Sequence, residues 1–537
     1  MRHMKFRGLL VFLAGAFAAL PVVLTQLSFL AFVSLTPFAF LLFSELTADT
    51  LPFRPRRYYG TGLSFCMGYF IVAFHWFVYL YPLDFVEGMT PFLAILIILL
   101  ACIGLPLLQS AGFAFLFWGM AHLSRTRMVR RVPLLLPFLL AAGWTVFAFT
   151  QTLTWAGVPF GAQLALSQQK NLLLLSSASF FGSYFVTFII GLCASLLGYA
   201  LFFLRSARRR AATVSLIACG VFLLNFGLSA IAYFRPLSEE GTVSVAVLQG
   251  NFSSSEKWSS GGESASVVYL SLAREAAEAG AELIVWPETA ITSHLQGGSV
   301  LRERIKSLAV ETGTYQVVGA FSYTPRDGKT IRQNSLYLFT PSGEVGDVLY
   351  HKRHLVPFGE FVPMENLIRT LFPALAGLEM LKDGTSLVAG DSAAIFETPI
   401  GDLGGLICFD TIYEGLARDS AASGAELFVI GTNDSWFFDS AAVYMHNGQA
   451  ILRAVENNRA VARAANTGIS SIITPKGESL KEIEPLVRGF AVAEIPLEDG
   501  MTLYTQIGDV FVLLCQLFIL FPFAFDLFAY IKRRIAK

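Results

Sequence analysis

Three side chains in the second half of the chain have the chemistry needed to move an acyl group: Cys408, Glu288 and Lys352. A thiol with a pKa of about 8.5 is mostly protonated at neutral pH and needs a base before it can act as a nucleophile. A carboxylate can take that proton, and an ammonium group can stabilise the negative charge that develops on a carbonyl oxygen. The three groups suffice for acyl transfer through a thioester, although sequence spacing alone does not show that they meet.

Apolar strands are expected directly before Glu288 and Cys408, and α/β folds place their ligands at strand ends. Three such strands end on polar or reactive side chains: ELIVWPE at 282–288, GLICFD at 405–410, and ELFVIGTND at 426–434, which ends on Asn433 and Asp434. Each candidate also has a purely structural interpretation. Cys408 fits a small core residue, Glu288 fits a helix cap, and Lys352 lies in a charged run with His351, Arg353 and His354.

Residues 235–507 read as an interleaved series of strands and helices. Further strands are expected at 243–251, 316–323 and 334–340, and helices at 265–280, 301–312, 412–423 and 443–463. This alternation predicts an α/β sandwich or layered sheet. The glycine patterns of a Rossmann fold and of a P-loop are absent from the sequence, so no nucleotide cofactor is expected.

Composition separates this region from the rest of the chain. The 537 residues are 54% hydrophobic and 15% charged, against roughly 25% charged in soluble proteins. The apolar residues are concentrated before 235 and after 507, whereas residues 235–507 carry 20 Lys/Arg and 33 Asp/Glu. An acidic domain is a poor match for nucleic acid. Cys408 is the only one of the six cysteines in this domain, and the usual zinc-binding spacings are absent, so no metal is expected.

The apolar residues predict eight membrane spans, because a helix of about 20 residues crosses a bilayer. The run from 8 to 46 divides near Pro21 into two spans; a cleaved signal peptide is the alternative for its start. The other spans are expected at 59–80, 90–121, 132–150, 172–204, 212–234 and 508–531. The domains are then a membrane domain at 1–234, a soluble domain at 235–507, and a last span with a basic tail at 508–537.

Charge predicts the orientation of these spans. The segments 2–7, 54–57, 125–131, 205–210 and 532–537 together carry 18 Lys/Arg, whereas the short loops on the other side carry only Lys170. Positively charged loops stay in the cytoplasm. We therefore expect both termini in the cytoplasm and residues 235–507 on the far side of the cytoplasmic membrane.

Several motifs resemble those of a known enzyme group. WPET at 286–289, HKRHLVPFGEFVP at 351–363 and ICFD at 407–410 are similar to the Glu, Lys and Cys motifs of the nitrilase superfamily. More narrowly, nearly the whole chain resembles the bacterial apolipoprotein N-acyltransferase family. The further matches are LQGNFSSSEKW at 248–258, RQNSLY at 332–337, GTNDSWF at 431–437, NTGIS at 466–470 and TLYTQIGD at 502–509.

The resemblance implies a fold and a role for each matching residue. The fold would be a polytopic α-helical membrane domain, with seven spans before and one after a nitrilase-like αββα sandwich. Glu288 would be the general base, Lys352 the cation that stabilises the oxyanion, and Cys408 the nucleophile. Glu360 would position Lys352, and the backbone N–H of Phe409 would face the oxyanion. Trp258 and Trp436 would border the acyl or headgroup path, with Asn334 and Asn433 as weaker candidates.

One position departs from the family pattern. The family commonly has Cys-Tyr-Glu where this chain has Cys408-Phe409-Asp410. Phe409 lacks the tyrosine hydroxyl, and Asp410 is one methylene shorter than glutamate, so the hydrogen bonds around the site are expected to differ. Glu414 is a candidate for compensating the shorter carboxylate.

The family also implies the reaction, its substrates and its location. Cys408 would take an acyl chain from a phospholipid, with phosphatidylethanolamine favoured, and pass it to the α-amino group of a lipoprotein's diacylglyceryl-cysteine. The location would be the periplasmic side of the bacterial inner membrane. Two alternatives stay open from the residues alone. One is a membrane-tethered amidase that releases its acyl group to water. The other is a transporter or scaffold with an inert nitrilase-like domain, for which His75 in a span is the clearest sign.

Overall fold

The computed structural model of the chain describes residues 2–46, 54–83, 89–153, 161–237, 241–253, 256–257, 263–326, 328–371 and 386–535. The chain divides into two compact units. The first comprises residues 1–77, 99–234 and 507–537, and the second comprises residues 78–98 and 235–506.

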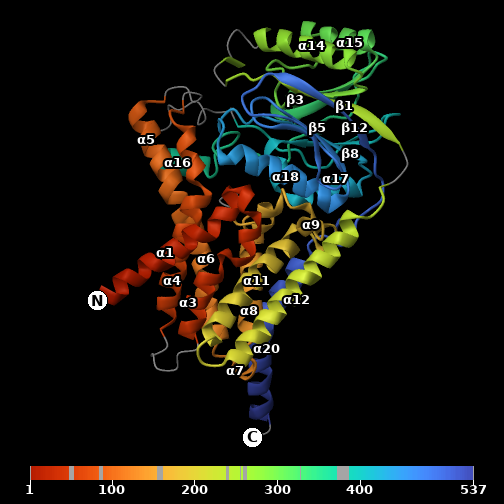
Figure 1. Ribbon diagram of the computed structural model, residues 1–537. Helices are drawn as coiled ribbons and strands as arrows, with labels where there is room; N and C mark the ends of the chain where they lie inside the picture. The colour runs from red at the N-terminus through yellow and green to blue at the C-terminus, as the bar shows by residue number, and fades with distance from the viewer. Residues whose placement is uncertain are drawn as a thin grey trace. The chain divides into compact units, whose positions relative to one another are not determined.

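Helices make up the first unit (Figure 1). In chain order these are α1 (Arg2–Val23), α2 (Ala31–Ser34), α3 (Thr36–Leu46), α4 (Pro55–Ala73), α6 (Leu105–Leu123), α7 (Arg127–Arg131), α8 (Leu135–Thr150), α9 (Leu172–Leu175), α10 (Ala178–Phe181), α11 (Ser183–Phe203), α12 (Arg208–Tyr233), α19 (Leu503–Ile507, the last residue only) and α20 (Val510–Ile535). Helix α5 (Pro91–Leu99) precedes α6 through a single π-helical turn, Leu100–Gly104.

Five helical stretches among the described residues are long and apolar enough to cross a membrane: Thr25–Leu46, Pro91–Leu123, Ser183–Phe203, Arg208–Tyr233 and Val510–Ile535. Shorter apolar helices lie at Arg7–Val23, Leu135–Thr150 and Leu172–Phe181. The expected run at 172–204 is therefore not one helix. It breaks at Gly182, whose φ of 79° lies in the left-handed region that interrupts a right-handed helix. Several apolar helices are thus confirmed, while the number of spans stays a prediction.

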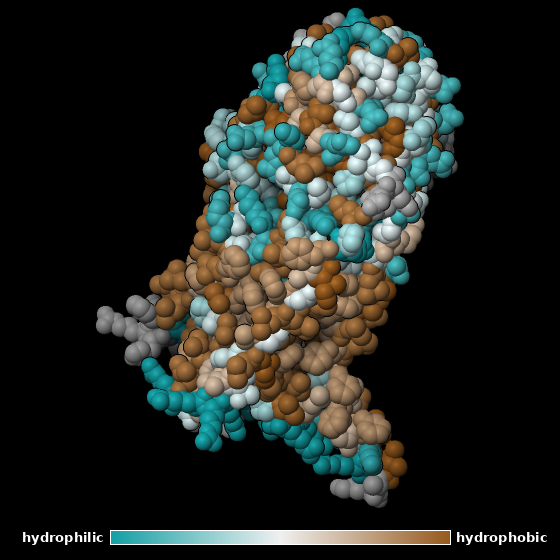
Figure 2. All heavy atoms as spheres, turned by 45° about the vertical axis from the view of Figure 1, so that its right-hand side comes forward, coloured by the Kyte–Doolittle hydropathy of each residue, from teal (hydrophilic) through white to brown (hydrophobic). Residues whose placement is uncertain are grey.

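Small residues let two of these helices pack closely. A side chain at Gly15 of α1 would meet the backbone of Phe65 in α4, and one at Gly68 of α4 would meet the backbone of Phe12 in α1. Such reciprocal glycines are typical of helices that associate in lipid, where close backbone approach replaces the hydrophobic effect. The outer surface of this unit is hydrophobic in Figure 2. On α12 the exposed side chains include Leu216, Leu223, Leu224 and Ile231.

Two six-stranded sheets form the centre of the second unit. The first has the order β12-β1-β2-β3-β4-β5, in which β1, β2 and β3 are parallel and the outer pairs are antiparallel. Its strands are β1 (Thr242–Gln249), β2 (Leu283–Val285), β3 (Tyr315–Arg326), β4 (Lys329–Phe339), β5 (Tyr350–His351) and β12 (Gly489–Pro496).

The second sheet repeats this arrangement with the order β11-β10-β9-β8-β7-β6. Here β7, β8 and β9 are parallel and the outer pairs are antiparallel. The strands are β6 (Ile395–Phe396), β7 (Leu403–Ile407), β8 (Leu427–Thr432), β9 (Ala460–Ala465), β10 (Ser470–Ile473) and β11 (Ser479–Ile483). Among the described residues, its α-helices are α14 (Glu263–Glu278), α15 (Val300–Thr312), α16 (Glu365–Leu371), α17 (Glu414–Ala422) and α18 (Ala441–Asn457), together with most of α5 and of α19.

Strand alternation divides the hydrophobic side chains between two cores. Val245 and Val247 of β1 face the core between the two sheets, whereas Ala246 and Leu248 face the helices α14 and α15. Figure 1 shows α14 and α15 outside the first sheet, with α17 and α18 on the other side of the pair. The layers are therefore helix, sheet, sheet, helix, as expected for the αββα sandwich.

One expected element is wrong. The helix expected at 443–463 ends at Asn457, because Asn458 adopts the left-handed conformation with φ of 53°. Residues 460–465 then form β9, buried on both faces between β8 and β10. The alanine-rich AVARAA segment has helical propensity, but pairing at the centre of the sheet overrides it.

Candidate active site

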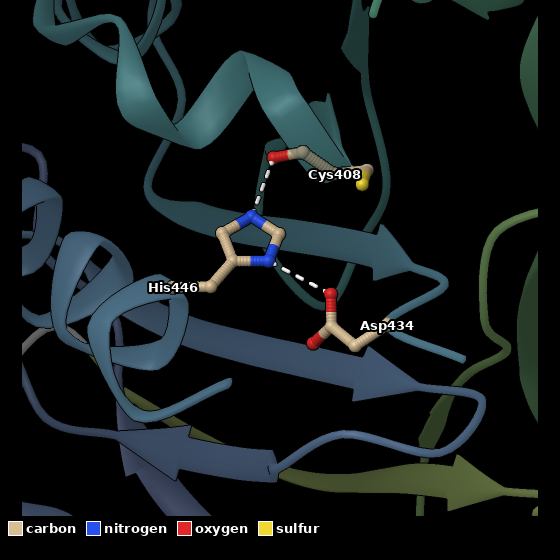
Figure 3. A group of neighbouring side chains, drawn as sticks. All are labelled: Cys408, Asp434 and His446. Atoms are coloured by element: carbon tan, nitrogen blue, oxygen red, sulfur yellow. Dashed lines mark hydrogen bonds and ion pairs between the residues drawn. The ribbon is translucent and has the colours of Figure 1, made fainter. Parts of the chain in front are cut away.

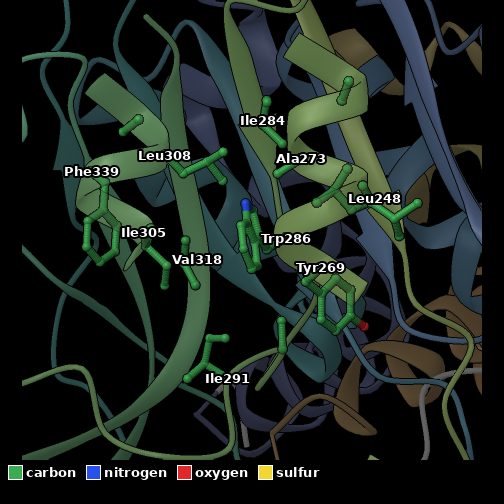
Figure 4. Close-up of a cluster of buried hydrophobic side chains, with 14 of the residues drawn as sticks. Leu248, Tyr269, Ala273, Ile284, Trp286, Ile291, Ile305, Leu308, Val318 and Phe339 are labelled. Atoms are coloured by element: carbon green, nitrogen blue, oxygen red, sulfur yellow. The ribbon is translucent and has the colours of Figure 1, made fainter. Parts of the chain in front are cut away.

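Glu288 lies in a turn whose position depends on the buried Trp286 before it and on Gly319 in the neighbouring strand β3. Strand β2 ends at Val285, and the next residue, Trp286, is fully buried between α14 and α15 in Figure 4. Its indole Nε1 donates a hydrogen bond to Gln316 Oε1 over 2.8 Å. A Cβ at Gly319 of β3 would meet the Pro287 carbonyl and the Glu288 Cα, so only glycine leaves room for this turn. The sequence WPE thereby fixes the carboxylate at the end of its strand.

Lys352 follows β5 and is almost completely buried, with 1% of its surface exposed. Its backbone N–H donates to Asn334 O over 2.8 Å, as an extension of the β4–β5 pairing. Its Nζ lies 2.9 Å from Glu288 Oε1 and 2.9 Å from Glu360 Oε2. Burial by itself lowers the pKa of this ammonium, but the two carboxylates outweigh burial and hold the pKa well above its ordinary value. Lys352 is therefore a permanent buried cation.

Asn334 and Glu360 complete this group. Asn334 Nδ2 donates to Glu288 Oε1 over 2.7 Å and to Glu360 Oε1 over 3.1 Å. Glu360 Oε2 also accepts the backbone N–H of Val356 over 2.9 Å. The structure thus brings Glu288, Lys352, Asn334 and Glu360 into one hydrogen-bonded cluster. Glu360 lies where it can position Lys352, as the family resemblance implies.

Cys408 is the first residue after β7 and begins a short 3-10 helix, Cys408–Ile412. Its φ of 49° is in the left-handed region, which is strained for any residue with a side chain. Burial raises the pKa of the thiol well above its ordinary value; Glu288 and Asp434 raise it further, and Lys352 opposes them. Cys408 therefore rests as a thiol, and a base has to take its proton before the sulfur can act as the candidate nucleophile.

Asp410 binds the backbone on both sides of the site. Its Oδ1 accepts the N–H groups of Arg353 (3.2 Å) and His354 (2.7 Å), and its Oδ2 accepts the Ile407 N–H (3.0 Å) and the Tyr350 hydroxyl (2.8 Å). Burial raises the pKa of Asp410 to about 6, against the lowering effect of Lys352 and these hydrogen bonds. The shorter carboxylate therefore joins the Cys408 turn to the Lys352 strand directly.

The other residues expected at the site lie outside the hydrogen-bonded cluster around Lys352 or outside the described residues. Glu414 is buried, and its Oε2 lies 3.9 Å from Arg453 Nη1. The four hydrogen bonds to Asp410 come from other residues, so Glu414 is not needed to compensate for the shorter carboxylate. Asn433 accepts a 3.0 Å hydrogen bond from Asn466 Nδ2, which joins the GTND and NTGIS motifs. Trp436 is partly exposed in the turn after β8. Trp258 lies outside the described residues.

A second buried ammonium, Lys257, was not singled out from the sequence. It is fully buried, and its Nζ donates to the carbonyl oxygen of Glu288 over 2.8 Å and to Thr289 Oγ1 over 2.7 Å. Burial lowers its pKa to about 8, while the charges of Glu288 and Cys408 oppose that change. The available signal was its place in the LQGNFSSSEKW motif. Lys257 supports the turn that carries the candidate base.

His446 is a second residue that sequence reasoning missed, because a lone histidine on a helix gives no distinctive signal. It lies on the buried face of α18, and Figure 3 shows it between Asp434 and the backbone of Cys408. Cys408, Asp434 and His446 offer donor atoms within 4.8 Å of one another, a spacing that a metal ion can use. However, both ring nitrogens of His446 already form hydrogen bonds and Asp434 is paired with Arg463. We therefore assign this group to hydrogen bonding.

Two parts of the chain match known protein families. Residues 14–196 match the family model described as the apolipoprotein N-acyltransferase N-terminal domain, and residues 244–503 match the carbon-nitrogen hydrolase model. An amidase from Nesterenkonia sp. is 19% identical, covers 52% of this chain and 97% of its own, and has a TM-score of 0.37.

Three curated relatives carry the name apolipoprotein N-acyltransferase. The protein of Geobacter metallireducens is 34% identical over 74% of each chain. That of Gloeobacter violaceus is 32% identical over 56% of each chain. That of Bradyrhizobium diazoefficiens is 28% identical over 94% of this chain and 92% of its own. These matches confirm the resemblance found in the sequence motifs: the chain belongs to the apolipoprotein N-acyltransferase family.

Proposed function

We propose that the chain transfers an acyl chain from a phospholipid, through a thioester on Cys408, to the α-amino group of the diacylglyceryl-cysteine of a lipoprotein. The observation that carries this proposal is the buried Lys352 ammonium, which binds the Glu288 carboxylate at 2.9 Å and acts electrostatically on the Cys408 thiol. A base, a nucleophile and an oxyanion partner are the groups that acyl transfer needs.

The first step forms the thioester. Glu288 takes the proton from the Cys408 thiol as the sulfur attacks the ester carbonyl carbon of the phospholipid. The carbonyl electrons move onto the oxygen, and Lys352 and the Phe409 N–H stabilise this oxyanion. When the oxyanion collapses, the C–O bond to the glycerol breaks and Glu288 returns its proton to the departing lysophospholipid. Glu360 and Asn334 keep the Lys352 ammonium in place throughout.

The second step consumes the thioester. The free α-amine of the diacylated lipoprotein attacks the thioester carbon, and the same oxyanion partners stabilise the intermediate. Glu288 accepts the amine proton, the oxyanion collapses and breaks the C–S bond, and Glu288 returns that proton to the Cys408 sulfur. The product is an N-acylated lipoprotein. The ester already holds the reactive acyl group, so this two-step reaction needs no nucleotide or metal cofactor.

Physical chemistry favours a site that both substrates reach from the bilayer. Each buried CH₂ group is worth about 0.8 kcal/mol, so lipids with two or more acyl chains stay in the membrane. The segments expected in the cytoplasm carry 18 Lys/Arg, and the short loops expected outside carry one. The proposed arrangement therefore has eight spans, with the catalytic domain on the periplasmic side of the inner membrane. Phosphatidylethanolamine is the proposed donor, on the basis of the family resemblance.

The test is intact-mass spectrometry of the full-length enzyme in phospholipid nanodiscs. With phosphatidylethanolamine alone, an acyl adduct should accumulate on Cys408. Adding a diacylated lipopeptide with a free α-amine should clear the adduct and yield an N-acylated product. An N-acetylated version of the same lipopeptide is the matched control and should leave the adduct in place.

Two outcomes would overturn the proposal. If the adduct clears rapidly in water without any amine, the chain is a hydrolase of the amidase type. If no adduct forms although Cys408 remains accessible to a small alkylating reagent, the thiol is not the acyl acceptor and the proposed route through a thioester is wrong.

A further inference from the structure

A buried side-chain relay ends on the backbone of the nucleophile. His446 Nε2 lies 3.1 Å from the carbonyl oxygen of Cys408, and His446 Nδ1 lies 2.8 Å from Asp434 Oδ1. The other carboxylate oxygen, Asp434 Oδ2, accepts a hydrogen bond from Arg463 Nη2 over 2.8 Å. All three side chains are at most 2% exposed. In Figure 3 the Cys408 carbonyl points at the imidazole, and the dashed line from the ring ends on this oxygen rather than on the thiol.

The Cys408 carbonyl defines which proton of His446 matters for this contact. A backbone carbonyl only accepts hydrogen bonds, so Nε2 must carry a proton to bind Cys408 O. Asp434 is held as a carboxylate, because Arg463 and His446 lower its pKa below the usual range although burial by itself raises it. Asp434 Oδ1 and Arg463 Nη2 both lie at the other ring nitrogen, Nδ1, at 2.8 Å and 3.2 Å. The proton that the contact with the Cys408 carbonyl requires is the one on Nε2.

The carbonyl that His446 binds belongs to the peptide between Cys408 and Phe409. In a trans peptide the C=O and N–H bonds point in opposite directions, so a donor that fixes the carbonyl also fixes the direction of the Phe409 N–H. This N–H is in the first turn of the Cys408–Ile412 helix, where amide groups have no acceptor within the helix. A hydrogen bond to the carbonyl also polarises the amide and strengthens its N–H as a donor.

We propose that His446, held by Asp434, is a positioning residue that directs and polarises the Cys408–Phe409 peptide, so that the Phe409 N–H binds the oxyanion of the tetrahedral intermediate. The inference rests on the proposed thioester chemistry at Cys408. His446 lies outside the Glu288–Lys352–Cys408 group and serves the step that forms the tetrahedral intermediate. The Thr411 hydroxyl, which donates to the same carbonyl over 2.8 Å, helps to hold the strained φ of Cys408.

Two reactions of the same thiol separate this role from a general structural one. Acylation by an ester passes through an oxyanion, whereas alkylation by iodoacetamide displaces iodide at carbon and forms none. His446→Phe keeps an aromatic ring but removes both ring nitrogens, including the Nε2 donor to the Cys408 carbonyl. In the full-length enzyme it should slow acylation by p-nitrophenyl butyrate by on the order of 10²-fold, the usual loss for one oxyanion donor. Alkylation of Cys408 should change by less than about fivefold, because the Glu288 base is untouched.

The conservative variant should restore part of the lost rate. The amide of His446→Gln can reach the Cys408 carbonyl as a neutral donor, so acylation should recover at least about tenfold relative to His446→Phe. Tyr444→Phe is the matched control: it removes one hydrogen bond, to Asp439, from the exposed face of the same helix and should leave both rates unchanged.

The results that would overturn the inference are specific. A parallel fall in acylation and alkylation shows that His446 only supports the local fold, and an unchanged acylation rate shows that the Phe409 N–H does not depend on it. The small ester makes the measurement independent of the lipid donor and the lipoprotein acceptor. Acylation by the small ester without any adduct from phospholipid would therefore refute the proposed function and leave this inference standing.

Discussion

The Nζ atom of Lys352 lies 2.9 Å from Glu288 Oε1, although 64 positions separate the two residues in the chain. This contact joins the turn after β2 to the end of β5, and Glu360 shares the same ammonium. Two carboxylates and one buried cation therefore depend on each other, both for the chemistry and for the fold.

Replacing the cation should damage stability and activity together. Lys352→Met leaves Glu288 and Glu360 buried without their partner, and removing one member of a buried ion pair costs about 3–5 kcal/mol. Thermal unfolding in detergent should show a clear loss of stability, and no acyl adduct should form. Lys306→Met, which breaks an exposed pair with Glu303, should do neither. An adduct formed at the normal rate by Lys352→Met would exclude Lys352 from the reaction.

Replacing the nucleophile and the base should separate their roles. Cys408→Ala should form neither adduct nor product. Cys408→Ser should turn over poorly, because an alkoxide is far harder to form than a thiolate. Glu288→Gln should slow adduct formation by on the order of 10²-fold or more, since the thiol loses its general base. Rapid single-turnover acylation by Glu288→Gln would show that another group takes the proton.

Asp410 tests the departure from the family pattern. In Asp410→Asn an amide NH₂ replaces one acceptor oxygen, so up to two of the four donors around Asp410 lose their partner in a buried site. The Cys408 turn and the Lys352 strand should shift, and turnover should fall by on the order of 10²-fold. Asp410→Glu keeps both acceptor oxygens and should retain more activity. Equal wild-type rates in both variants would show that the position has no catalytic importance.

The lowered pKa of Lys257 predicts a pH dependence of stability. The folded-state pKa is about 8 and the ordinary value is 10.5, so between these pH values the unfolded chain binds a proton that the folded chain does not. This group therefore costs stability below about pH 8, and the cost of about 3 kcal/mol is relieved as the pH rises towards 10.5. Relative to Lys257→Met, the wild-type enzyme should gain melting temperature from pH 8 to pH 10. A constant difference across that range would contradict the burial of a charged Lys257.

The membrane orientation can be tested with topology reporters. A reporter fused after residue 537 should be cytoplasmic, and one inserted near Gly261 should be extracytoplasmic, because 18 Lys/Arg lie in the segments expected inside and one lies outside. Alkaline phosphatase and green fluorescent protein fusions at both places provide complementary readouts. Both reporters on the same side would contradict the eight-span arrangement.

The sequence by itself determined the features that depend on local pattern. Continuous apolar runs predicted the helices of the first unit, because a helix in lipid must be apolar on most of its surface. Alternating valines at 243–251 predicted β1, and the Ala- and Glu-rich segment 265–280 with its terminal glycine predicted α14. Motif resemblance supplied Glu288, Lys352 and Cys408 together with Glu360 and Asn334. The fold brings Glu288, Glu360 and Asn334 into one hydrogen-bonded cluster with Lys352.

The tertiary structure decided what depends on distant partners. Residues 460–465 form a strand only because β8 and β10 pair with them, and nothing in AVARAA shows those neighbours. Lys257 became part of the site through contacts with Glu288 and Thr289, which lie about 30 positions away. His446 gained its place through Asp434 and the Cys408 carbonyl. A buried polar group is defined by the partners that replace water, and those partners exist only once the two sheets have packed together.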